Sequence, residues 1–254
     1  MITDSFDLDS PAKINPDLNG YRVKCDGCVV TFSFIIKEYI LDNFPYIEIG
    51  KLKSCTGWVP VYLIDYKGKL IAFFKTYVGA PITVGLLEDV TELIDTDDFV
   101  VFGAAGTLDK KIEQGSIMVP TEAYRDEGTS YHYAKPADYI KIKNHNIVSD
   151  FLSEIGIRYF EGKTWTTDAF FRETENNIKR RQDDGCISVE MECSAVQAWA
   201  DFRNLNLYYF LVSGDLLDAP RWDARHQNSE LSANHHCNNV TFAFDLIAEK
   251  GGLR

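Results

Sequence analysis

The run at residues 207–212 most constrains what this chain can fold into. It reads Leu-Tyr-Tyr-Phe-Leu-Val without a single charge, which is typical of a strand that is covered on both faces. Other strand-like runs predict five further strands, at residues 28–34, 59–66, 69–75, 99–102 and 116–120. A sheet with a strand buried in this way needs helices on both of its sides.

Helix-like segments alternate with these strands. Apolar residues recur close to the helical period in residues 82–95, and similar segments predict helices at 144–155, 168–183, 191–203 and 240–249. The alternation predicts an α/β fold, a three-layer α/β/α sandwich with a central mixed, largely parallel sheet. We expect a single domain over residues 1–254, with residues 1–20 as an extended arm that Pro11 and Pro16 keep irregular.

Charge and hydropathy exclude several classes of protein. The formal net charge is -12, and the densest basic group, which ends at Arg181, is followed at once by Asp183 and Asp184, so no nucleic-acid partner is expected. No stretch approaches the roughly 20 apolar residues of a membrane span, and the N-terminus lacks the order of a signal peptide. We therefore expect a cytoplasmic protein with no membrane partner.

The six cysteines give weak support for a metal site or for disulfides. Cys25 and Cys28 have metal-knuckle spacing, but no second such pair exists, although His235, His236 and Cys237 offer further ligands. The chain is long and has no export signal, which argues against disulfides. We expect no metal, and we interpret Cys25 and Cys28 as small apolar residues that enter a strand.

Three acidic residues stand at the ends of segments that look buried. Glu190 and Glu192 flank Met191 inside an apolar run, and Asp215 follows the strand-like run that ends at Val212. Acidic side chains are costly to bury unless each has a partner or a task. Their placement indicates a polar ligand that carries hydroxyl groups and an atom to be protonated.

A small-residue segment follows another apolar strand. Residues 99–102 run into Gly103, Ala104, Ala105 and Gly106, and small side chains there let a ligand approach the backbone closely. The order is neither that of a dinucleotide-binding motif nor that of a P-loop. On composition alone, a tight turn that packs a helix and a cradle for a ligand are equally good interpretations.

Five short motifs follow one another between residues 76 and 218. They are Tyr77-Val78-Gly79-Ala80-Pro81; Phe102-Gly103-Ala104-Ala105-Gly106; residues 115–120 with 125–133; Gly162-Lys163-Thr164-Trp165 and its continuation to Phe171; and Val189-Glu190-Met191-Glu192. In this order they resemble the nucleoside phosphorylase and nucleosidase superfamily, in particular its purine nucleoside and uridine phosphorylase branch. The first 70 residues show little of this resemblance.

The resemblance implies cleavage of the N-glycosidic bond between ribose and a nucleobase. It implies that Glu192 holds the 2′- and 3′-hydroxyls, since a carboxylate accepts from both at once, with Met191 as an apolar floor or a core gap-filler. Val189 belongs to the same motif, and Glu190 is expected to form an ion pair that shapes the loop. Trp165 takes the place of the aromatic residue that stacks on the base.

The same resemblance implies roles for the loop of the first motif and for a proton donor. Gly79 belongs to the loop that precedes a helix, and Asp215 is the candidate donor to the departing base, which needs surroundings that favour its neutral form. A glycine separates Ser213 from Asp215 where the family has Ser-Asp, so Asp218 is an alternative. Arg221 or Arg225 is expected to stabilise this acid or to be an exposed loop charge, and Asp168 is expected to cap a helix.

The nucleophile end of the site departs from the family. Val101 stands where the phosphorylases place an arginine, Ala104 replaces a serine that touches phosphate, and the N-terminal phosphate loop has no counterpart. Candidate replacements for the lost anion contacts are Lys37, Lys75, Arg125 and an arm of a neighbouring subunit. In the nucleosidases a glutamate activates water, and Glu38 is the nearest candidate for that role.

Three interpretations therefore stay open. The first is a purine-leaning nucleoside phosphorylase with inorganic phosphate as co-substrate and no other cofactor. The second is a nucleosidase that uses water, and the third is a nucleoside- or nucleotide-binding protein on the same fold. The resemblance also implies a homo-oligomer, either a dimer or a hexamer, whose small-molecule partners are the nucleoside and phosphate.

Overall fold

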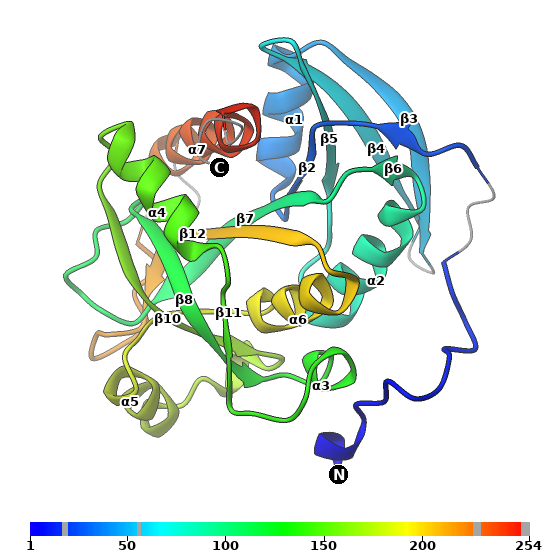
Figure 1. Cartoon of the computed structure of the whole chain (residues 1–254). Coiled ribbons are helices and arrows are strands. Elements are labelled where there is room, and N and C mark those ends of the chain that lie inside the picture. Colours follow the sequence, from blue (N-terminus) through cyan, green and yellow to red (C-terminus); the bar gives the residue numbers. More distant parts are fainter. Residues whose placement is uncertain (17–19, 55–56, 226–229, 250–254) are drawn as a thin grey trace.

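The computed structural model describes residues 1–16, 20–54, 57–225 and 230–249, with side chains for all of these except 230–239. Its centre is a ten-stranded sheet in the order β11-β10-β8-β12-β7-β2-β5-β4-β3, with β9 added to β8 (Figure 1). The strands are β2 (Gly27–Thr31), β3 (Tyr46–Ser54), β4 (Gly57–Tyr66), β5 (Lys69–Lys75), β7 (Asp98–Thr107), β8 (Ile117–Asp126), β9 (Tyr139–Lys141), β10 (Tyr159–Thr167), β11 (Cys186–Glu190) and β12 (Asn206–Leu216). A separate parallel pair joins β1 (Val23–Lys24) to β6 (Ile94–Asp95).

Parallel pairing dominates the middle of the sheet. β7 lies parallel to both β12 and β2, and β2 lies parallel to β5, so the carboxyl ends of these four strands meet at one edge. β10 runs parallel to β8 and β11, and β11 returns to pair antiparallel with β7. This half of the sheet curls on itself and brings the end of β11 beside the end of β7. Ligands of open α/β sheets bind at such carboxyl edges.

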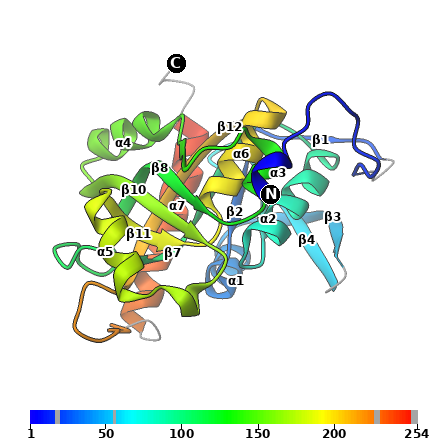
Figure 2. The same cartoon turned by 90° about the horizontal axis from the view of Figure 1, so that it is seen from below.

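Helices cover both faces of the sheet (Figures 1 and 2). On one face α1 (Phe34–Asn43), α4 (His145–Glu154) and α7 (Glu230–Glu249) pack on Phe73 of β5 and Phe210 of β12. On the other face α2 (Ala80–Thr91) and α6 (Cys193–Arg203) pack on Phe74 and Val101. Phe73 and Phe74 separate because successive strand residues face opposite sides. The predicted three-layer α/β/α fold with a mixed sheet is confirmed.

Several predicted element boundaries are wrong. The strand expected at 28–34 ends at Thr31, because the Ser33 hydroxyl accepts from the N–H of Ile36 at 3.3 Å and caps α1. The helix expected at 168–183 is divided into a short 3-10 helix, η2 (Phe170–Arg172), and α5 (Glu175–Asp183). The elements β3, β10, β11 and α1 were not predicted, and the helix expected at 240–249 begins earlier, at Glu230.

The glycine segment after Phe102 is a strand and not the tight turn that was one prediction for it. β7 continues through Gly103 and Gly106 to Thr107. A Cβ atom at Gly103 would lie 2.7 Å from Cδ2 of Phe32, and one at Gly106 would lie 2.6 Å from Cδ1 of Leu217. The absence of side chains therefore permits close packing across the strand, without any need for a turn.

The tip of the N-terminal arm lies against the body of the chain. Within the described residues 1–16, the one regular element is a 3-10 turn, η1 (Ile2–Asp4), and Figure 2 shows it beside α3 (Ser130–Tyr133). A Cβ atom at Gly128 would lie 3.2 Å from Cδ1 of Ile2. Across the described part of the chain, no helix has the length and apolar character needed to span a bilayer.

Candidate functional site

The candidate site lies where the carboxyl ends of β5, β7, β11 and β12 approach the N-terminal ends of α2 and α6. The segment after β5 passes through Gly79 into α2, and β11 ends at Glu190 just before α6 begins at Cys193. Two of the five motifs named above are thus held at the starts of neighbouring helices. These two helices pack together in one core, which fixes the distance between the motifs.

Glu192 is buried and is bonded to the loop before α2. Its side chain is 5% exposed, and its Oε1 atom accepts from the backbone N–H of Gly79 at 2.5 Å. Gly79 has φ +113, a conformation that favours glycine. Burial, and next the charge of Glu190, raise the pKa of Glu192. A hydroxyl-bearing ligand that donates to this carboxylate would offset the cost of its burial.

Glu190 organises the loop through hydrogen bonds. Its carboxylate accepts from the hydroxyl of Thr166 at 2.6 Å and from the backbone N–H groups of Glu192 and Cys193, both at 2.7 Å. The predicted ion pair of Glu190 is not formed: among the described residues, no lysine or arginine lies within 4.0 Å of its carboxylate. Hydrogen bonds replace the cation, and they place Glu192 at the start of α6.

The part of the site that the sequence resemblance assigns to a base, the base end, is formed by β7, β11 and the end of β12. A Cβ atom at Gly106 would lie 2.9 Å from Cγ1 of Val189 and 3.7 Å from Oδ1 of Asp215. Val189 is buried, and Met191, two residues on, is half-buried between the two glutamates. The structure thus brings together Val189, Gly106 and Asp215, which are 109 residues apart at their extremes.

Asp215 has an indole partner that the sequence did not predict. Its Oδ2 atom accepts from Nε1 of Trp222 at 2.6 Å. Arg221 is exposed, and the Arg225 guanidinium donates to backbone carbonyls, among them that of Gly214 at 3.3 Å. Asp218, the alternative acid, accepts from the backbone N–H of Lys110 at 3.0 Å. Of these residues, Trp222 is the one whose side chain forms a hydrogen bond with Asp215.

Trp165 lies beside the base end but is packed in. Its side chain is 2% exposed and shares a small cluster with Leu108, Cys186 and Val189, while its Nε1 donates to Oδ2 of Asp126 at 3.0 Å. Contact with Val189 fits the place of a base-stacking ring. The prediction that Asp168 caps a helix is wrong, because Asp168 accepts from the N–H of Gly128 at 3.1 Å instead.

The part of the site that the sequence resemblance assigns to the nucleophile carries no cation at positions 101 and 104. Val101 is fully buried in the core, and Ala104 exposes only a methyl group. Arg125 is wrong as a replacement. The residue is 4% exposed, and its guanidinium donates to Ser130 Oγ and to the carbonyls of Ala134 and Lys135. Lys37 and Lys75 lie at the ends of α1 and β5 that face this region.

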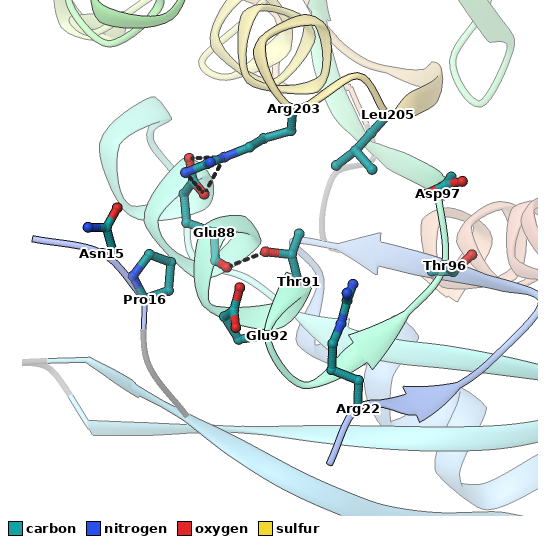
Figure 3. A pocket seen from close by; sticks show the side chains of 10 residues that line it. All are labelled: Asn15, Pro16, Arg22, Glu88, Thr91, Glu92, Thr96, Asp97, Arg203 and Leu205. Atoms are coloured by element: carbon teal, nitrogen blue, oxygen red, sulfur yellow. Dashed lines mark hydrogen bonds and ion pairs between the residues drawn. The ribbon is translucent and has the colours of Figure 1, made fainter. Parts of the chain in front are cut away.

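A hollow of about 330 Å³ lies at the other ends of α2 and α6, as Figure 3 shows. The Arg203 guanidinium contacts both carboxylate oxygens of Glu88 there, with Nη2 at 2.8 Å from Oε2. One helix length, roughly 15 Å, separates the hollow from Glu192. It is lined by Asn15, Pro16, Arg22, Glu88, Thr91, Glu92, Thr96, Asp97, Arg203 and Leu205. Its pairing of opposite charges sets it apart from the candidate site.

Cys25 and Cys28 are free and buried. The described residues include no group of three or more His, Cys, Asp or Glu side chains that would hold a metal ion. The side chains of His235, His236 and Cys237 lie outside the described ones. Burial raises the pKa of the Cys25 thiol to about 11, which is the behaviour of a small apolar residue.

Glu173 is a further acid near Asp215 that the sequence did not single out. It follows η2, and burial, then the charge of Asp215, raise its pKa to about 7 from 4.5. A raised pKa means that the stability Glu173 contributes is present below pH 4.5 and is lost as the pH rises through about 7.

We therefore expect Glu173→Gln to gain stability over the native protein as the pH rises. The difference in unfolding free energy should change by on the order of 1 kcal/mol, a discounted figure because the carboxyl is partly exposed. Denaturant unfolding at pH 4.5, 6 and 8 measures it. Glu175→Gln, on the exposed start of α5, is the matched control, and an equal pH response of both variants would contradict the prediction.

Comparisons with known proteins agree with this fold. The family model described as the phosphorylase superfamily matches residues 32–248. An uncharacterized protein of Acanthamoeba polyphaga mimivirus is 27% identical over 182 residues, 65% of this chain and 68% of that protein. A DeoD-type purine nucleoside phosphorylase of Bacillus cereus is 23% identical over 185 residues, 72% of this chain and 76% of the relative.

Solved structures share the fold at lower identity. Uridine phosphorylase of Vibrio fischeri has a TM-score of 0.70 and 21% identity, covering 87% of this chain and 90% of its own. Purine nucleoside phosphorylase of Toxoplasma gondii has a TM-score of 0.73 and 15% identity, covering 94% and 97%. The fold and the matching family model together define an enzyme of the nucleoside phosphorylase class. The chain belongs to the phosphorylase superfamily.

Proposed function

We propose that this protein is a nucleoside phosphorylase that cleaves a purine nucleoside with inorganic phosphate and releases the free base and ribose 1-phosphate. The observation that carries the proposal is the buried Glu192, bonded to Gly79 and held in place by Glu190. Such a carboxylate suits a pair of vicinal hydroxyls. The relative from Bacillus cereus, a purine nucleoside phosphorylase, supports the choice of reaction and base.

In the proposed reaction Glu192 accepts hydrogen bonds from the 2′- and 3′-hydroxyls, and Met191 contacts the sugar. An oxygen of phosphate forms a bond to C1′ while the bond from C1′ to the base nitrogen breaks, and its electron pair goes to the base. Asp215, at the base end beside Gly106, donates a proton to the departing base. Val189 and Trp165 contact its ring, and electrostatic stabilisation of the departing charge lowers the barrier.

We also propose that the enzyme acts in the cytoplasm and as a homo-oligomer. Support for an oligomer comes from apolar side chains exposed near the candidate site, which a second copy would cover. They are Phe34, Ile35, Tyr77, Val78, Phe170 and Phe171. Sedimentation velocity of the purified protein measures the oligomeric state directly, and a monomer would contradict this part of the proposal.

The test of the function is release of free base from purine and pyrimidine nucleosides, with and without inorganic phosphate. We expect release that depends on phosphate and is faster for inosine than for uridine. Chromatography of the products gives the base, and an assay for ribose 1-phosphate gives the other product. Phosphate-dependent release of base without ribose 1-phosphate would contradict the proposed reaction.

A phosphate-independent nucleosidase is the second candidate function. It is favoured by the lack of a cation at Val101 and Ala104. In that case water attacks C1′, and ribose is the product. Glu38, the candidate base for that water, is ion-paired with Lys37 at 3.1 Å. Release at equal rates without phosphate would establish this function, whereas tight binding of nucleosides without release would indicate a binding protein.

A further inference from the structure

Two lysines stand at the carboxyl edge of β2 and β5. Lys75 is the last residue of β5 and pairs in register with Thr31, the last residue of β2. Lys37 lies on α1, which starts directly after β2. Lys75 shares the face of Phe73, two residues before it, and Phe73 packs in the core that α1 covers. Both cations therefore belong to the same side of the same edge.

Lys75 is a half-buried cation without an anionic partner among the described residues. Its ammonium donates to the carbonyl of Thr76 at 3.0 Å and lies 4.5 Å from the centre of the Tyr77 ring. No carboxylate in the described chain lies within the 4.0 Å of an ion pair. Burial, and then the charge of Lys37, lower the pKa of Lys75. Lys37 is ion-paired with Glu38 at 3.1 Å, whereas an anion bound beside Lys75 would offset both unfavourable effects on Lys75.

The position of this pair relative to the ribose end is set by a short piece of chain. Three residues lie between Lys75 and Gly79, and the N–H of Gly79 donates to Glu192. The first turn of α1 begins at the same edge with Ser33 as its cap, and helix N-termini attract anions. A cation pair and a helix start thus stand on one side of the candidate sugar site.

We propose that Lys75 and Lys37 bind a tetrahedral oxyanion, the inorganic phosphate of the proposed reaction. The assignment rests on the proposed function and replaces contacts that Val101 and Ala104 do not make. Lys75 at the end of β5 neutralises part of the charge of the phosphate, and Lys37 on α1 supplies a second positive charge. Lysine acts here as a point charge, in contrast to the two-pronged contact of an arginine.

The experiment compares the full-length protein with Lys75→Met, Lys37→Met and Lys75→Arg. Lys141→Met is the matched control, since Lys141 is an exposed lysine of β9 and its loss changes the net charge equally. Calorimetry measures binding of inorganic phosphate, of inosine and of inosine 5′-monophosphate, and kinetics give the KM for phosphate. Thermal melting verifies that each variant is folded, and Lys75→Gln replaces Lys75→Met where the latter fails to fold.

We expect Lys75→Met to weaken phosphate binding about tenfold or more, with inosine binding changed less than twofold. Lys37→Met should weaken phosphate binding less, Lys75→Arg should keep most of it, and Lys141→Met should change nothing. Phosphate binding that is unchanged in Lys75→Met would overturn the inference, even in an active phosphorylase. Absence of phosphate binding in the native protein would overturn it as well.

Two other outcomes separate the inference from the proposed function. If no nucleoside is cleaved but phosphate binding depends on Lys75, the proposed function fails and the anion site stands. If inorganic phosphate does not bind, while the 5′-monophosphate binds in a Lys75-dependent way, the assignment to the phosphate co-substrate is overturned. In that case the lysines hold the phosphate of a nucleotide.

Discussion

Glu192→Ala should lower kcat/KM for nucleosides by about a hundredfold to ten-thousandfold. The physical reason is that one buried carboxylate would hold two ribose hydroxyls, and a hydrogen bond to a charged group contributes about 1.5–3 kcal/mol. Steady-state kinetics with inosine measure the effect. Glu192→Gln keeps the shape and one acceptor oxygen, so its loss should be intermediate.

Substrates that lack one ribose hydroxyl test whether the loss in Glu192→Ala comes from the contacts with the hydroxyls. In the native protein 2′-deoxyinosine and 3′-deoxyinosine should react more slowly than inosine, since each leaves one contact to Glu192 unmade. In Glu192→Ala the three substrates should differ little, because the partner of both hydroxyls is gone. A full preference for inosine in the variant would remove Glu192 from the ribose site.

Protein stability is the control for this experiment. The pKa of Glu192 is raised by burial and by Glu190, so whatever stability Glu192 contributes is present at low pH and is lost as the pH rises through its folded pKa. Glu192→Gln should therefore melt no lower than the native protein in alkaline buffer. A large fall in the melting temperature of Glu192→Gln in alkaline buffer would show that its kinetic loss comes from misfolding.

The layers of the fold were predictable because they depend on apolar burial. The uncharged run that became β12 and the run that became β7 are covered on both faces, and their composition shows it. The strands β10 and β11 were missed, because they bury hydroxyl groups. Ser188 donates to Oγ1 of Thr164 at 2.9 Å, across 24 residues of sequence. A residue pattern along one strand does not reveal that a polar side chain is paired with another strand.

The candidate site was predictable where a short motif carries it and not where distant loops meet. Glu192 and its neighbours stand in one motif at the start of α6, and the structure places them together. Trp222 and Glu173 come from loops whose paths depend on the whole fold, so their approach to Asp215 has no signal in the sequence. Arg125 has the charge of an anion ligand, but three nearby acceptors occupy its guanidinium.

The surroundings of Asp215 bear on how a base is protonated. Trp222 donates to Oδ2 of Asp215 at 2.6 Å, while Oδ1 would lie 3.7 Å from a Cβ atom at Gly106. Glu173, whose pKa is raised to about 7, keeps a proton near this carboxyl at lower pH. The indole fixes one oxygen, and the other stays available to donate to a base under the proposed function.

Asp215→Asn should lower kcat for inosine by about a hundredfold to ten-thousandfold, the usual contribution of a general acid, with KM changed only a few-fold. An amide keeps the contact with the base but does not release a proton to it. The substrate 7-methylguanosine tests this reason, because its base already carries a positive charge and leaves without protonation. Its turnover should be nearly equal in the native protein and in Asp215→Asn.

Asp218→Asn is the matched control, since Asp218 bonds to the N–H of Lys110 in the loop after β7. It should leave kcat for inosine within a few-fold of the native value, because its removal loosens one loop contact and no contact with the base. The opposite result, a large loss in Asp218→Asn with full activity in Asp215→Asn, would transfer the acid to Asp218. Equal losses for inosine and 7-methylguanosine in Asp215→Asn would instead show that Asp215 positions the base without protonating it.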